Sequence, residues 1–72
     1  MRDITYKSSN GRTLEIQLAS DDSIDYTFYA PDGSDIDGGQ VGENCESMSD
    51  ADALRLVLNF AEIDFPGAVA IE

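Results

Sequence analysis

The chain has 72 residues and is strongly acidic, since 15 Asp and Glu stand against 4 Lys and Arg, and the formal net charge is −11. Its apolar fraction of 42% is typical of a folded domain, and its length predicts one domain, residues 1–72, with a small core. The composition argues against direct nucleic-acid binding, which requires Lys and Arg facing phosphates. Because the sequence contains no His, the commonest general base and metal ligand is also absent.

Membrane spans and disulfides are not expected either. No apolar run approaches the roughly 18–20 residues of a membrane-spanning helix, and the N-terminal residues do not resemble a signal peptide. Cys45 is the single cysteine, whereas secreted domains of this size usually carry several. We therefore expect a cytoplasmic protein with no cofactor and no membrane partner. Without a His to activate it, Cys45 is interpreted as a bystander rather than a nucleophile.

Three segments alternate apolar and polar residues, which is the pattern of half-buried strands. They cover residues 3–7, 13–18 and 24–29. Asn10-Gly11 predicts a hairpin turn between the first two segments. Pro31-Asp32-Gly33 predicts a turn after the third, because Pro presets its backbone angle and Gly accepts the left-handed conformation.

A fourth strand is expected over residues 34–41, at the edge of the sheet. It has only Ile36 and Val41 to bury, and its adjacent glycines, Gly38 and Gly39, predict a bulge near them. The carboxylates of this segment would discourage pairing between sheet edges of different molecules.

A helix is predicted over residues 50–63, with Ser49 as its N-cap and acidic residues in its first turn. Its apolar arc is broader than that of an ordinary surface helix. The expected fold is a two-layer α+β sandwich, in which an antiparallel four-stranded meander carries one helix and is followed by a short C-terminal strand or tail. The predicted core consists of Ile4, Tyr6, Leu14, Ile16, Leu18, Ile24, Tyr26, Phe28, Leu54, Val57, Leu58 and Ala61.

Leu56, Phe60 and Ile63 make the apolar face of the predicted helix wider than one face of the sheet can cover. Either residues 65–71 fold over this helix flank or a second chain does. We expect the first arrangement and a monomer, with a dimer through the helix flank as the alternative.

The acidic turn that contains Asp32, Asp35 and Asp37 is the densest polar cluster. Its oxygen groups suggest calcium, but when Asp37-Gly38 is set at positions 5 and 6 of an EF-hand loop, Gly33 and Asn44 fall at positions 1 and 12, and two key oxygen ligands are lost. Asp35 and Asp37 have the spacing of residues on one face of a strand, yet nothing marks a pocket that would desolvate them for acid–base work. We therefore predict a solvated turn, with no metal site and no catalytic residue.

Exposed aromatic and acidic side chains supply the candidate partner-binding residues. Tyr29 falls on the outer phase of its strand, where an aromatic side chain can anchor a partner or simply shield the sheet. With the acidic turn and the helix flank, the candidate set is Tyr29, Asp32, Asp35, Asp37, Leu56, Phe60 and Ile63.

The acidity itself has two interpretations. Ten carboxylates lie between residues 21 and 52, and no base occurs between Thr13 and Leu54. The first hypothesis is a non-enzymatic acidic protein-interaction module whose protein partner has a basic surface. The alternative is a nucleic-acid mimic that inhibits a DNA- or RNA-binding protein. A row of carboxylates along one face would favour mimicry, whereas carboxylates spread around the fold would favour the module.

Residues 26–39, with the sequence YTFYAPDGSDIDGG, resemble a family of small accessory domains found on bacterial mobile elements. Together with the segment TLEIQL and the later Leu-rich helix, they look like domains of the large polyvalent protein-associated type. The resemblance covers about residues 4–63. It implies an uncharacterised cytoplasmic adaptor from a conjugative or phage-like element, and it carries no catalytic residues to this chain.

Overall fold

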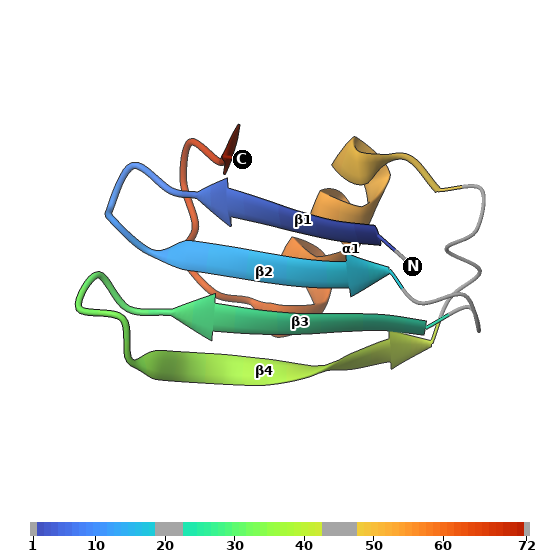
Figure 1. Ribbon diagram of the computed structural model, residues 1–72, viewed down its shortest axis with the longest axis horizontal. Coiled ribbons are helices and arrows are strands. Elements are labelled where there is room, and N and C mark those ends of the chain that lie inside the picture. The colour runs from blue at the N-terminus through green and yellow to red at the C-terminus, as the bar shows by residue number, and fades with distance from the viewer. Residues whose placement is uncertain (1, 19–22, 43–47, 72) are drawn as a thin grey trace.

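The computed structural model describes residues 2–18, 23–42 and 48–71, which form one antiparallel sheet and one helix (Figure 1). The sheet has the strand order β4-β3-β2-β1-β5, and α1 lies across one of its faces. The elements are β1 (Arg2–Lys7), β2 (Thr13–Leu18), β3 (Ser23–Tyr29), β4 (Asp35–Gly42), α1 (Asp50–Ala61) and β5 (Val69–Ile71). The predicted α+β class, with its four-stranded meander, single helix and short C-terminal strand, is confirmed.

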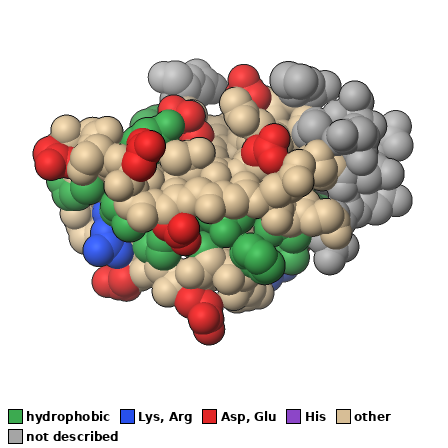
Figure 2. Space-filling model, turned by 90° about the horizontal axis from the view of Figure 1, so that it is seen from below, with side chains coloured by type: hydrophobic (Ala, Val, Ile, Leu, Met, Phe, Trp, Pro, Cys, Tyr) green, Lys and Arg blue, Asp and Glu red, His purple; other side chains and the backbone are tan. Residues whose placement is uncertain are grey.

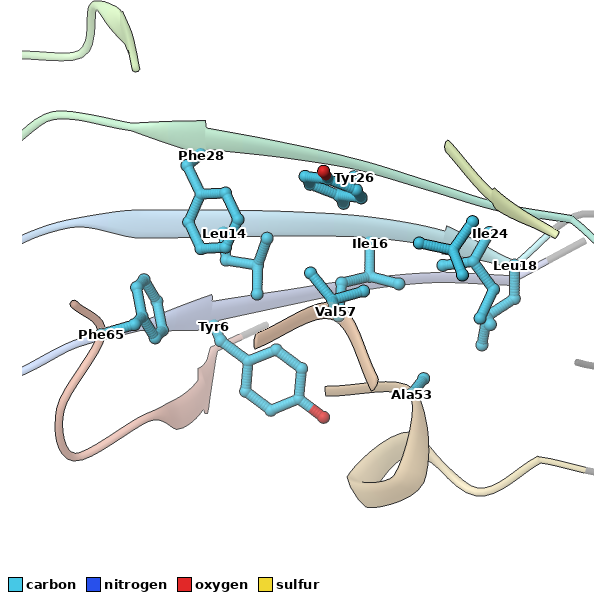
Figure 3. Packing of buried hydrophobic residues seen from close by; sticks show 11 residues of the cluster. Tyr6, Leu14, Ile16, Leu18, Ile24, Tyr26, Phe28, Ala53, Val57 and Phe65 are labelled. Carbon is cyan, nitrogen blue, oxygen red and sulfur yellow. The ribbon is translucent and has the colours of Figure 1, made fainter. Parts of the chain in front are cut away.

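The alternating strands bury one face of the sheet against α1, as predicted (Figure 3). Phe28 is the largest fully buried side chain, and its ring makes edge-to-face contacts with Tyr26 and Phe65, each at 5.7 Å between ring centroids. All twelve predicted core residues are buried or packed against the buried cluster. That cluster consists of Tyr6, Leu14, Ile16, Leu18, Ile24, Tyr26, Phe28, Val41, Ala53, Val57 and Phe65.

The helix begins where the sequence predicts and ends two residues earlier. The Ser49 side chain accepts a hydrogen bond from the Asp52 backbone N–H at 3.2 Å, as an N-cap does. After Ala61 the chain leaves the helix, because Glu62 adopts the left-handed conformation with φ of 56° and donates its N–H to the Leu58 carbonyl. Ile63 therefore lies beyond the helix, although it still packs against the core.

The C-terminal segment takes a different path from the one expected. Residues 69–71 pair with β1 at the edge of the sheet, where Val69 and Ile71 stay exposed, and they do not cover the helix flank. The predicted packing of residues 65–71 over that flank is therefore wrong, and Phe65 is buried against Phe28 of β3 instead. Phe60 remains 58% exposed.

The turn between β1 and β2 explains this path, since it holds residues 64–66 by hydrogen bonds. Arg12 Nη1 donates to the Asp64 carbonyl at 2.8 Å, and the Ser9 backbone N–H donates to the Pro66 carbonyl at 2.8 Å. The turn itself lies at the predicted Asn10-Gly11, with Gly11 at φ of 88°. These bonds direct the chain toward β1 and away from the exposed side of the helix.

The bulge in β4 also differs in position from the prediction. Gly38 and Gly39 pair regularly with Thr27 and Tyr26, whereas the register shift falls at Ile36, between Asp35 opposite Tyr29 and Asp37 opposite Phe28. Gly39 is required for a different reason: a Cβ there would lie 2.9 Å from the Tyr26 hydroxyl oxygen and 3.2 Å from its ring. The glycine therefore makes room for an aromatic ring from the neighbouring strand.

No helix within the described ranges combines the length and the apolar composition needed to cross a bilayer.

Candidate interaction surface

An exposed aromatic side chain marks the side of the molecule that carries β4. Phe60 projects from α1 with 58% of its surface exposed, and its ring meets Tyr26 edge-to-face at 6.1 Å. Leu56 lies one turn earlier on the same side of the helix and is partly buried. Figure 2, which looks onto the lower side of Figure 1, where β4 lies, shows hydrophobic side chains gathered there with carboxylates beside them. We call β4, Tyr26, Leu56 and Phe60 the β4 surface.

Tyr26 links the strand to the helix within this surface. Its side chain is only 5% exposed, because the ring lies over Gly39 on one side and against Phe60 on another. Burial raises the pKa of the Tyr26 hydroxyl, and the carboxylate of Asp37 raises it further. The strand register explains why Asp37 lies close enough to Tyr26 to affect it. Asp37 is opposite Phe28, and its side chain is therefore on the helix side of the sheet, as the Tyr26 ring is.

Among the described residues, β4 is an edge strand, with no further strand on the side away from β3. All of its residues are exposed except Val41, which packs into the core opposite Ile24. In an edge strand, alternate N–H and C=O groups point away from the sheet and are available to a further strand. The other edge is β5, which has only three residues.

Asp35 and Tyr29 lie together on the opposite face of the sheet. The bulge at Ile36 reverses the expected relation between Asp35 and Asp37, since Asp35 pairs with Tyr29 on the outer face. The Tyr29 hydroxyl donates to Glu15 Oε1 at 3.5 Å. Desolvation raises the pKa of Tyr29, as do the carboxylates of Glu15 and Asp35. The prediction that both aspartates share one face is therefore wrong.

Asp32 serves the turn in which it lies. Its Oδ1 accepts hydrogen bonds from the Ser34 backbone N–H at 3.0 Å and the Ser34 hydroxyl at 2.7 Å, and these bonds lower the pKa of Asp32. The same turn is closed by the Gly33 N–H, which donates to the Ala30 carbonyl. In the part of the chain that the structure describes, no group of three or more acidic or Cys side chains is placed to hold a metal ion.

The seven predicted partner-binding residues thus fall into separate places. Asp37, Leu56 and Phe60 lie on the helix side of the sheet, toward β4. Tyr29 and Asp35 lie on the outer face, Asp32 lies in a turn, and Ile63 packs against the core beyond the helix. The alternation in the sequence predicts Tyr26 in the core but does not indicate its contact with Phe60. Its pairing with Gly39 depends on the strand register, which the sequence left open.

The described carboxylates of the acidic stretch do not form a single row. Asp25 and Asp35 lie on the outer face, Asp37 on the helix side, and Asp32 in the turn. The remaining pair, Asp50 and Asp52, lies in the first turn of α1, where each carboxylate forms an ion pair with an arginine, at 3.2 and 3.3 Å respectively. Residues 21, 22, 43 and 46, and Cys45, lie outside the described residues.

No protein-family model, curated protein or solved structure matches the chain.

Proposed function

We propose that the chain is a non-enzymatic acidic protein-interaction module that binds a basic protein partner through the β4 surface. The exposure of Phe60 supports this proposal more than any other observation. Large aromatic side chains in well-packed positions often carry much of the binding energy of a protein interface. Phe60 packs against the Tyr26 ring, and Asp37 lies on the same side of the sheet.

The charge of the chain supports a basic partner. A net charge of −11, with no base between residues 13 and 54, creates a field that attracts positive surfaces and accelerates their encounter. The same field repels a second copy of the chain, so the module is proposed to act as a cytoplasmic monomer. The resemblance to accessory domains of bacterial mobile elements fits an adaptor of this kind, and that origin stays part of the proposal.

The nucleic-acid mimic remains the alternative, and the described carboxylates favour it less. A mimic needs its charges in a row that follows a phosphate backbone, whereas these carboxylates lie on both sheet faces, in a turn and at the start of the helix. Two of them are also paired with arginines. This arrangement suits general electrostatic attraction better than imitation of a duplex.

Affinity capture from a lysate of the host organism tests the proposal. The immobilised wild-type chain is compared with Phe60→Ala and with Ile71→Ala, a matched apolar residue that is 43% exposed on β5. We expect a protein that is retained by the wild type and by I71A, lost with F60A, and released as salt shortens the Debye length from about 10 Å at 0.1 M to about 3 Å at 1 M.

Two results would contradict the proposal. If the same protein is captured equally by all three chains, the β4 surface is not its binding site. If the chain retards duplex DNA or RNA in a gel at low salt, the electrostatic argument fails, since four basic residues on a chain of this charge should not displace enough counterions.

A further inference from the structure

We propose that the β4 surface binds its partner by strand addition: an extended basic segment pairs with the free edge of β4 and places an apolar side chain against Phe60 and Tyr26. This inference rests on the proposed function and specifies the partner segment and its mode of binding. It is based on three features of one side of the molecule: the unpaired edge of β4, the aromatic contact beside that edge, and the negative charge around it.

The edge supplies the backbone partners. β4 has eight residues, and β3 occupies only one of its sides. Its exposed residues leave alternate backbone donors and acceptors open to an added strand, which is the mode of recognition used by proteins that bind extended peptides at a sheet edge. The three residues of β5 provide a much shorter edge on the other side.

Gly39 lets the Tyr26 ring reach the edge of the sheet, where a side chain of the added strand can contact it. In a sheet, residues directly opposite each other on neighbouring strands lie on the same face and in contact. Because Gly39 has no side chain, a partner residue opposite it on the helix side meets the Tyr26 ring, which lies over Gly39, and the Phe60 ring next to it. An apolar partner residue at that position would cover the exposed part of Phe60.

The charge selects a basic occupant. Asp37 on the helix side and Asp35 on the outer side flank this edge, and Asp25 lies on the outer face of β3. A second copy of β4 would bring the same carboxylates to the same edge, and like charges directly opposite each other destabilise strand pairing. A segment that alternates Lys or Arg with apolar residues presents bases to Asp35 on the outer face and apolar side chains to Phe60 on the helix side, where Asp37 adds only to the general negative field.

The probe is an eight-residue capped peptide that alternates Lys and Val, the length of β4. It is titrated into isotope-labelled full-length chain, with amide NMR shifts and hydrogen exchange as the readouts. We expect saturable binding, the largest shifts in β4, and new exchange protection at alternate β4 amides. A matched peptide with N-methyl groups on the residues of one edge keeps its charge and side chains, and it should bind at least about tenfold more weakly, a free-energy difference of about 1.4 kcal/mol.

Protein variants test the two selective features separately. Phe60→Ala should weaken peptide binding about tenfold, while Ile71→Ala, which changes an exposed apolar residue on the far edge, should leave it unchanged. Asp35→Asn should reduce the association rate and its salt dependence more than Asp3→Asn, which removes the same charge from β1.

Several outcomes would overturn the inference. Equal binding of the N-methylated peptide, or shifts confined to α1 with unprotected β4 amides, would show docking on the helix flank without strand addition. In that case a Phe60-dependent capture from lysate would still support the proposed function. Absence of saturable peptide binding, or pairing of β4 with a second copy of the chain, would rule out a basic strand as the occupant.

Discussion

The β1 side and the β4 side of the sheet hold the rest of the molecule by different means. On the β1 side, Arg2 pairs with Asp50, Tyr6 donates its hydroxyl to the Asp50 carbonyl, and Arg12 donates to the Asp64 carbonyl. On the β4 side, the contact between strand and helix is made by rings, with Tyr26 lying over Gly39 and against Phe60. Polar anchoring fixes the position of chain segments, whereas the ring contact leaves an aromatic surface exposed. The polar contacts of the β1 side hold the helix and the C-terminal segment in place, and we propose the β4 side as the one that a partner binds.

The largest expected effect comes from the residue that joins the two sides. Phe28 is fully buried, and its ring touches both Tyr26 and Phe65. Phe28→Ala should cost about 3–5 kcal/mol in the free energy of unfolding, a large part of the roughly 3–10 kcal/mol expected for a chain this short. We expect a largely unfolded chain in circular dichroism at 37 °C. A variant that unfolds cooperatively near the wild-type temperature would show that the aromatic contacts are not central to the core.

A second prediction addresses the β4 side alone. Gly39→Ala should destabilise the fold by about 1–3 kcal/mol, because the new methyl group displaces the Tyr26 ring. The matched control is Gly42→Ala in the same strand, where the added carbon would meet nothing within 4 Å. Urea unfolding of both variants measures the difference. Equal stabilities would mean that the ring of Tyr26 can move without cost, and the support for Phe60 would be weaker than we infer.

The sequence was sufficient for the parts of the fold that depend on local pattern. Alternation placed Leu14, Ile16 and Phe28 in the core, and the Ser49 N-cap placed the start of the helix. The path of β5 was not predictable, because it depends on hydrogen bonds between residues 64–66 and a turn more than fifty residues earlier. Neither was the separation of Asp35 from Asp37, since a one-residue bulge reverses which face a side chain occupies.

In the candidate site, too, the local pattern predicts some features and long-range contacts decide others. An excess of apolar residues along the helix predicted that something must cover Leu56 and Phe60, but the expected cover, residues 65–71, lies elsewhere and Phe60 is exposed. The role of Tyr26 depends on the register between β3 and β4, which places Gly39 opposite Tyr26 and which the local pattern does not encode.

A third prediction tests the polar anchoring of the β1 side. Arg12→Ala removes the hydrogen bond to the Asp64 carbonyl and should lower the free energy of unfolding by about 0.5–1.5 kcal/mol. Lys7→Ala removes the same charge from the exposed residue at the end of β1 and serves as the control. Urea unfolding at fixed ionic strength separates the two effects. An R12A variant as stable as K7A would show that the turn does not hold the C-terminal segment.

The smallest effect concerns alkaline pH. Burial raises the pKa of Tyr26 and of Tyr6 in the folded chain, with Asp37 and Asp50 respectively adding to the shift. The pKa of each tyrosine is higher in the folded chain than its unfolded value of about 10. The neutral tyrosines therefore make a contribution to the free energy of unfolding that is fully present below pH about 10 and is lost as the pH rises through the folded pKa. Tyr26→Phe should therefore lose less stability than the wild type between pH 9 and 11, as estimated by melting temperature. An identical decline in both chains would mean that Tyr26 ionises as freely in the folded state as in the unfolded one.

The central claim is that β4 is a free edge in the isolated chain. Native-state hydrogen exchange of the free protein, measured residue by residue by NMR at two protein concentrations, tests it most directly. We predict that alternate amides of β4 exchange quickly while their neighbours, bonded to β3, are protected, and that the pattern does not change with concentration. Protection of every β4 amide, or protection that grows with concentration, would show that the edge is already covered and that β4 is not free.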